Sequence, residues 1–162
     1  MRTLGLDPGS RVTGIGIIEG ERLIAARQLD LGGGEMPARL AAIFTGVAEV
    51  IAEFSPDAAA VETVFMSRNP QAAIKLGQAR GAAICAAVHA GLEVHEYAPR
   101  LIKQAIVGRG GADKKQVQHM VRALLRTDAP FGADAADALA VALCHHHSQQ
   151  TARRLPKGVV FR

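Results

Sequence analysis

The first thirty residues alternate apolar and polar positions as β-strands do. Residues 3–7 follow a period of two, the side-chain period of a strand. Residues 13–18 and 22–29 are rich in β-branched and apolar residues, and the turn sequences Pro8-Gly9-Ser10 and Glu19-Gly20-Glu21 separate the three runs. Short turns between consecutive strands predict an antiparallel meander.

A helical period replaces this alternation after the glycine run at residues 32–34. Pro37 opens an amphipathic stretch that ends at Ser55-Pro56. The apolar run at residues 58–61 follows that helical crossover, so we expect a buried strand parallel to the first, joined by a right-handed connection. Residues 93–97 form the last predicted strand.

Residues 70–89 are apolar nearly all round, which predicts a helix buried on two sides. One side can cover the sheet, and the other needs a different partner. Gly77 and Gly81 are four residues apart, a spacing that permits the close approach of another backbone. This pattern leaves two readings open: packing within the chain, or a dimer interface formed by Gly77, Arg80, Gly81 and Ile84.

Further helical patterns cover residues 100–107, 113–125 and 134–147, and a glycine-rich loop lies at 108–111. The predicted fold is α/β: a five-stranded mixed sheet, three strands antiparallel and then two parallel, with helices on both faces. We expect a single domain over residues 1–150 and a flexible basic tail over 151–162. Sites in such sheets form beyond the carboxyl ends of the parallel strands.

Composition agrees with one globular domain, because 49% of the 162 residues are apolar and 21% are charged. No apolar run approaches the roughly 20 residues that span a bilayer, and the amino terminus lacks a signal core, so we expect a soluble cytoplasmic protein. Cys85 and Cys144 both lie in alanine-rich helical patterns, which suits reduced, buried thiols; a disulfide between them stays open.

Four carboxylates stand at the edges of apolar segments, where an unpaired charge is costly. Asp7 and Glu62 each end a predicted strand, and Asp134 and Asp137 lie three apart at the start of an apolar helix, on one face. Asp134 alone is also explained as a first-turn residue favoured by the helix dipole. Oxygen ligands without Cys or His suit Mg²⁺ or Mn²⁺. The set predicts a metal-dependent phosphodiester enzyme with these four acids as ligands and catalytic residues.

The net charge of +4 includes these acids, so the surface around them is more basic than the total indicates. A basic surface around an acidic pocket suits a polyanion. The alternative is an ordinary solvated basic surface.

Several sequence segments carry a family resemblance: Leu6-Asp7-Pro8-Gly9-Ser10, Thr13-Gly14-Ile15-Gly16, Val61-Glu62, Val64-Phe65-Met66, Lys75-Leu76-Gly77-Gln78-Ala79-Arg80-Gly81, Gln116-Val117-Gln118-His119-Met120-Val121 and Asp134-Ala135-Ala136-Asp137-Ala138-Leu139. Together they resemble the RuvC-type Holliday junction resolvases of bacteria. The resemblance runs from Met1 to about His145 in the family's order and spacing. It implies a ribonuclease-H-like fold, a homodimer that nicks opposed strands of a four-way DNA junction, two Mg²⁺ ions per site that Mn²⁺ can replace, and a branch-migration partner of the RuvA and RuvB type.

The resemblance also implies contacts with DNA. It assigns Lys103 and Lys114 to phosphates near the cut and Phe65 to stacking on an unpaired base at the branch point. Basic residues near these positions are further candidates for the DNA-binding rim: Arg68, Arg109 and Lys115. Solvated lysines and a core phenylalanine are the alternative interpretation.

Three other readings stay open. One is a related ribonuclease-H-like nuclease that acts on RNA or on other branched DNA, and another is a junction-binding protein without catalysis. A phosphate binder of the actin or sugar-kinase class shares the Asp7-to-Gly14 pattern but needs a second, homologous half. His145-His146-His147 suits softer metals than Mg²⁺, and at a predicted helix end it is better explained by the dipole.

Overall fold

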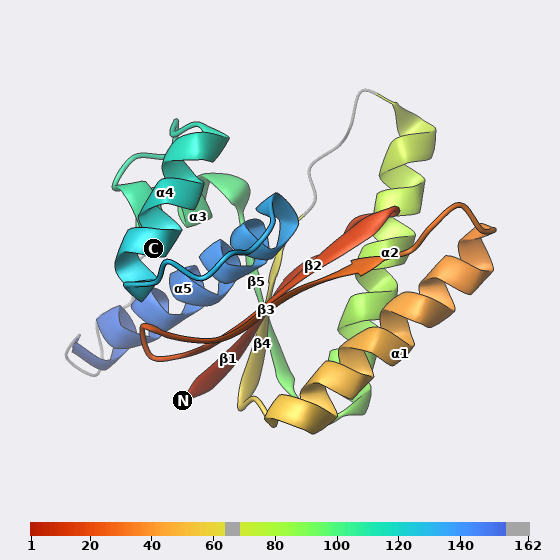
Figure 1. Ribbon diagram of the computed structural model, residues 1–162, viewed down its shortest axis with the longest axis horizontal. Helices are drawn as coiled ribbons and strands as arrows, with labels where there is room; N and C mark the ends of the chain where they lie inside the picture. The colour runs from red at the N-terminus through yellow and green to blue at the C-terminus, as the bar shows by residue number, and fades with distance from the viewer. Residues whose placement is uncertain (64–68, 155–162) are drawn as a thin grey trace.

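The computed structural model describes residues 1–63 and 69–154. Its sheet has the order β3-β2-β1-β4-β5 (Figure 1). β1 pairs antiparallel with β2 and β2 with β3, whereas β4 runs parallel to β1 and β5 parallel to β4, which confirms the predicted mixed sheet. The strands are β1 (Arg2–Asp7), β2 (Val12–Glu19), β3 (Arg22–Asp30), β4 (Ala58–Glu62) and β5 (Glu93–Tyr97); the helices are α1 (Met36–Phe54), α2 (Pro70–His89), α3 (Pro99–Val107), α4 (Lys114–Leu125) and α5 (Ala133–Arg154).

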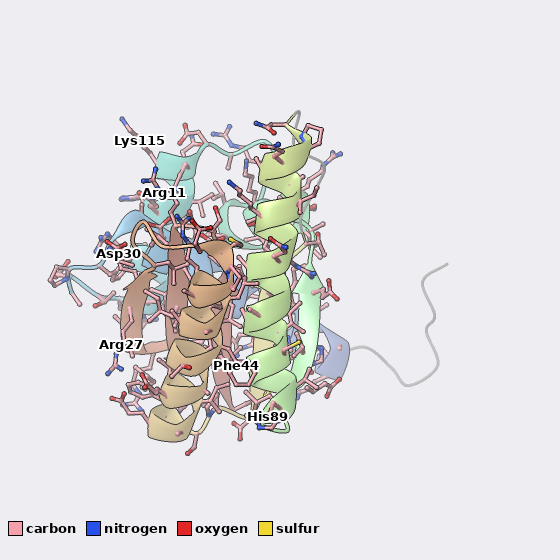
Figure 2. The ribbon with its side chains drawn as sticks, turned by 90° about the vertical axis from the view of Figure 1, so that its right-hand side faces the viewer. Arg11, Arg27, Asp30, Phe44, His89 and Lys115 are labelled. Atoms are coloured by element: carbon pink, nitrogen blue, oxygen red, sulfur yellow. The ribbon has the colours of Figure 1, made fainter. Side chains whose placement is uncertain are left out.

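Helices cover both faces of the sheet. α1 and α2 pack on one face and α3, α4 and α5 on the other (Figure 1). α1 and α2 lie side by side, and the rings of Phe44 and His89 meet near one end of the pair with centroids 5.8 Å apart (Figure 2). β1 is the central strand, so its residues Thr3 to Leu6 are buried on both faces.

Glycines in β1 and β2 bring α5 into direct contact with the sheet. A Cβ atom on Gly14 would lie 2.0 Å from the carbonyl oxygen of Asp134, and one on Gly5 would lie 2.0 Å from that of Ala138. Neither separation is sterically possible, so these positions have to be glycine for the helix to lie this close. Because Gly14 is the cross-strand partner of Asp7, the first turn of α5 is held beside the end of β1.

α2 differs from the prediction of burial on two sides. Ala79, Ala83 and Ala86 are buried in the core, whereas Ile74 is 62% and Val88 58% exposed. Cys85 is exposed as well, so its predicted burial is wrong, while Cys144 is buried as expected; both thiols are free. Periodicity reports which positions are apolar, but among the residues that the structure describes no second layer covers the outer apolar positions Ile74 and Val88 of α2.

α5 continues to Arg154, seven residues beyond its predicted end at His147. Residues 151–154, which the sequence assigned to the tail, are therefore helical, and the histidine run is not at a helix end. The Thr151 hydroxyl donates to the His147 carbonyl one turn earlier, and Arg153 and Arg154 place positive charge in the last turn, where the helix dipole favours it. None of the described helices is long and apolar enough to cross a membrane.

Candidate active site

The carboxyl ends of two parallel strands bring the first two acids together. β1 and β4 are neighbours, and their register pairs Leu6 with Val61. Asp7 follows Leu6, Glu62 follows Val61, and each acid is the last residue of its strand. Both acids therefore lie at one edge of the sheet. This placement matches the prediction from the sequence.

The first turns of α5 bring the other two acids to the same edge. Asp134 and Asp137 lie on the helix that Gly14 admits beside Asp7. The ammonium of Lys114, from the first residue of α4, lies 2.6 Å from Oδ2 of Asp137. The capping box formed by Asp113 and Gln116 starts α4 at this point and so places Lys114 over the acids.

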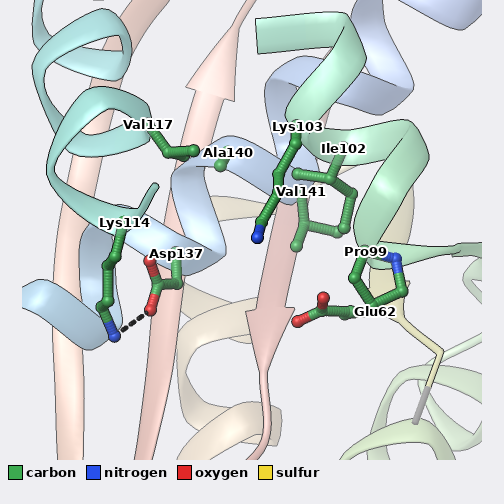
Figure 3. A pocket seen from close by; sticks show the side chains of 9 residues that line it. All are labelled: Glu62, Pro99, Ile102, Lys103, Lys114, Val117, Asp137, Ala140 and Val141. Carbon is green, nitrogen blue, oxygen red and sulfur yellow. Dashed lines mark ion pairs between the residues drawn. The ribbon is translucent and has the colours of Figure 1, made fainter. Parts of the chain in front are cut away.

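A hollow of about 210 Å³ opens between these elements (Figure 3). Glu62 and Asp137 line it on opposite sides, and the Lys103 side chain from α3 reaches toward the space between them (Figure 3). Since one water takes about 30 Å³ of liquid volume, the hollow has room for a phosphate group and several waters. Apolar side chains form its floor and walls, among them Ile102, Val117, Ala140 and Val141.

The acids influence one another strongly. Burial, together with the charges of Asp137, Glu62 and Asp134, raises the pKa of Asp7 to about 7. Burial and the charge of Asp137 also raise the pKa of Glu62, while Lys103 and Lys114 act to lower it. The hydrogen bond to Asp137 raises the pKa of Lys114. The site thus carries more negative charge than its two lysines neutralise.

This charge and this donor set fit a divalent cation. Carboxylate oxygens are the ligands that Mg²⁺ and Mn²⁺ prefer, and a cation would relieve the repulsion that raises the pKa of Asp7. Within residues 1–63 and 69–154, no three acidic, histidine or cysteine side chains form a finished metal-binding cluster. The backbone brings the four acids together and their charges act on one another, but their side chains are not arranged around a common point. Lys114 is already paired with Asp137.

The predicted DNA-contact residues fall into three groups. Lys103 and Lys114 line the hollow. Arg109 and Lys115 are exposed and outside the lining of the hollow, and Lys115 lies toward the same end of the molecule as Arg11, the residue before β2 (Figure 2). The predictions for Phe65 and Arg68 lie outside the described residues.

The predicted dimer residues all lie on α2 but face different surroundings. Gly77 is exposed, and a Cβ on Gly77 or Gly81 would meet nothing within 4 Å. Ile84 is half-buried against the core, and the Arg80 guanidinium contacts β4 and β5 of its own chain. Sequence reasoning missed that Arg80 contacts β4 and β5 of its own chain. It also missed that Gly14 lets α5 lie close to the sheet, although a glycine inside a β-branched run was an available signal for a close approach of another backbone.

Comparison with known proteins identifies the family of this chain. The family model described as crossover junction endodeoxyribonuclease RuvC matches residues 3–145. A curated protein of that name from Vibrio cholerae is 56% identical over 155 residues, covering 91% of this chain and 88% of its own, and one from Alkalilimnicola ehrlichii is 54% identical over 161 residues, covering 97% and 98%.

A solved structure extends the match to three dimensions. Thermus thermophilus RuvC in complex with a Holliday junction substrate superposes with a TM-score of 0.86 at 36% identity, covering 94% of this chain and 96% of that one. The fold, the length and the sequence agree over nearly the whole chain. This chain therefore belongs to the RuvC family of crossover junction endodeoxyribonucleases.

Proposed function

We propose that this protein is an endonuclease that resolves four-way DNA junctions by paired, symmetric nicks. The observation that carries the proposal is that Glu62, Asp137, Lys103 and Lys114 line one open hollow. Asp7 lies near enough to Glu62 and Asp137 for their charges to raise its pKa. In each nick a water oxygen bonds to phosphorus while the bond from phosphorus to the 3′ oxygen breaks, leaving a 3′ hydroxyl and a 5′ phosphate. No protein nucleophile takes part.

The four acids would hold the metal. Asp7, Glu62, Asp134 and Asp137 are the proposed ligands of two Mg²⁺ ions, which Mn²⁺ can replace. When bound, such ions supply charge stabilisation at the phosphate and acidify the attacking water. The carboxylates also accept hydrogen bonds from that water, which orients its oxygen toward phosphorus. Asp7 would hold the metal at the centre of this set, because it ends the central strand β1 and the charges of the other three acids act on it.

The lysines would bind the phosphate. Lys103 reaches toward the space between the acids, and Lys114 is 58% exposed although it pairs with Asp137. An ammonium near a non-bridging phosphate oxygen stabilises the negative charge that builds up during attack. Arg109 and Lys115, outside the lining of the hollow, would add contacts to the DNA backbone farther from the cut. By the family resemblance, Arg68 would be a further contact to the DNA backbone, and Phe65 would stack on an exposed base at the branch point.

A homodimer would supply two such sites, one for each opposed strand. The exposed apolar positions on α2, including Ile74 and Val88, support this helix as the dimer contact, with Gly77 and Gly81 permitting close approach. Two chains related by a two-fold axis match the symmetry of a four-way junction. We also propose that the dimer acts in the cytoplasm together with a branch-migration complex of the RuvA and RuvB type.

Cleavage of a synthetic junction tests the proposal. An end-labelled four-way junction is incubated with Mg²⁺ or EDTA, beside linear duplex and an RNA–DNA hybrid of the same sequence. We expect metal-dependent nicks at symmetric positions in the junction alone, and their loss in Asp7→Asn. Equal cutting of the linear duplex or the hybrid would indicate a different nuclease of this fold, and tight binding without cutting would leave only a recognition role.

A further inference from the structure

Arg80 connects three elements next to the active site. It lies on α2, and its side chain is only 19% exposed. Its Nε donates a hydrogen bond to the main-chain carbonyl of Glu62 at 3.0 Å, and its Nη2 pairs with the Glu96 carboxylate on β5. One guanidinium therefore links α2 to the ends of β4 and β5.

Glu62 needs such a contact because its strand loses one neighbour at this point. The β1–β4 register ends at Leu6 and Val61, so Glu62 lies one residue beyond the last pair. On the other side β5 continues, with Glu62 opposite Tyr97 and the Thr63 amide donating to the Tyr97 carbonyl at 2.8 Å. Beyond the β1 ladder, the carbonyl of Glu62 is held by a side chain from α2.

Arg80 binds the carbonyl of Glu62 and not its carboxylate. Its charge is paired with the Glu96 carboxylate, and this ion pair offsets the desolvation penalty of partly burying a guanidinium. The Glu62 carboxylate, in contrast, lines the hollow with Lys103 and Lys114. Arg80 can thus fix the backbone of Glu62 while leaving its carboxylate for chemistry.

We propose that Arg80 is a positioning residue for Glu62: through the Glu62 carbonyl it sets where that carboxylate stands, and hence how well the site binds metal and cleaves. The proposal rests on the proposed function. Partners that orient a metal ligand typically change metal affinity or activity 10- to 100-fold when they are removed. Because α2 also carries the proposed dimer face, Arg80 lies between that face and the cleavage site.

The test replaces Arg80 and follows cleavage, junction binding and metal binding separately. Arg80→Gln removes the charged fork, and Arg80→Lys keeps the charge but a single ammonium cannot reproduce the planar fork that serves both partners. Lys75→Gln, on an exposed part of the same helix, controls for the loss of one positive charge. Single-turnover cleavage is measured at saturating junction, junction affinity in EDTA, dimerisation by sedimentation, and metal binding by the Mg²⁺-induced rise in Tm.

We expect Arg80→Gln to cleave on the order of 10- to 100-fold more slowly, with junction affinity and dimerisation as in the unmodified protein. It should also need more Mg²⁺ for half-maximal rate and show a smaller Mg²⁺-induced rise in Tm. Lys75→Gln should match the unmodified protein in its Mg²⁺ requirement and in its Mg²⁺-induced rise in Tm. If Arg80→Gln fails to fold, Arg80→Lys provides the same comparison, with a smaller loss expected.

Three results would overturn the proposal: an unchanged rate in a folded Arg80 variant, an unchanged response to Mg²⁺, or a slow rate that recovers fully when the protein concentration restores the dimer. If the unmodified protein fails to cleave four-way junctions at all, the proposed function is at fault. The Mg²⁺-induced stabilisation then still decides whether Arg80 positions Glu62.

Discussion

Removing the charge of Asp7 should stabilise the metal-free protein while abolishing cleavage. Asp7 lies at the end of the central strand, surrounded by Asp137, Glu62 and Asp134, and its pKa is about 7 against an ordinary value of 3.8. The folded state therefore binds a proton that the unfolded state has released. Asp7→Asn keeps the shape of the side chain and removes the charge that folding opposes.

The sign and size of the effect follow from proton linkage. Below pH 3.8 the Asp7 carboxyl is protonated in the folded and in the unfolded state, so it does not change the free energy of unfolding. As pH rises from there to about 7, the carboxyl ionises in the unfolded state alone, and folding becomes less favourable. This penalty is complete above the pKa of the folded state. A difference of about three pH units corresponds to about 4 kcal/mol. Because Asp7 keeps some solvent contact, we expect about 2–4 kcal/mol at pH 8, which raises Tm by roughly 5–10 °C in a domain of this size.

Urea denaturation in EDTA at pH 4.5 and pH 8 measures the effect. Asp7→Asn should be more stable than the unmodified protein at pH 8, with the gap reduced to about a quarter of that size at pH 4.5, because the ordinary pKa of 3.8 leaves the unfolded carboxyl mostly ionised there. Asp128→Asn, at an exposed position, should show no gap. Mg²⁺ should stabilise the unmodified protein and narrow the gap at pH 8. Equal stabilities at pH 8, or a gap as large at pH 4.5 as at pH 8, would refute the electrostatic account.

Three further predictions concern other parts of the molecule. Gly14→Ala should lower stability by about 1–3 kcal/mol and the cleavage rate on the order of 100-fold, because a methyl group there collides with the first turn of α5. Gly34→Ala, with open space around it, is the matched control. If the two variants behave alike in urea denaturation and cleavage assays, the packing argument is contradicted. Lys114→Gln should slow cleavage about 100-fold at saturating junction but cost less than about 1 kcal/mol of stability, because the Lys114 side chain is 58% exposed. A normal single-turnover rate would remove Lys114 from phosphate binding. Burial lowers the pKa of His145 to about 4, so the stability of the protein should fall as pH drops from 6.5 toward 4. His145→Asn keeps a partner for the Tyr97 hydroxyl, and its urea midpoint should fall less steeply over that range. Parallel curves for the two proteins would exclude His145 as the cause.

The sheet and the position of the acids could be predicted because each depends on local pattern. Alternation and turns define the strands, and the parallel crossover to β4 then forces Asp7 and Glu62 to one edge. The placement of Asp134 and Asp137 followed from helix spacing and the apolar run after them. These inferences need only the period of the chain and the handedness of its connections.

Partners that come from distant elements could not be predicted in this way. Lys114 was expected to contact phosphate, but its ion pair with Asp137 depends on how α4 starts relative to α5. Arg80 was assigned to a dimer contact from its place on α2, whereas its bond to Glu62 depends on a side-chain direction that periodicity does not contain. The length of α5 and the exposure of Cys85 were missed for a related reason, since both depend on what surrounds the helix.

Resolution of a cruciform extruded from a supercoiled plasmid tests the central claim most directly. Two nicks in opposed strands within the lifetime of one complex convert the plasmid to linear DNA, whereas a single nick relaxes it to an open circle. With Mg²⁺ present we predict linear product from the unmodified protein and intact supercoiled plasmid with Asp7→Asn. Accumulation of open circles, or equal cutting of a plasmid without the cruciform, would contradict a dimeric junction resolvase.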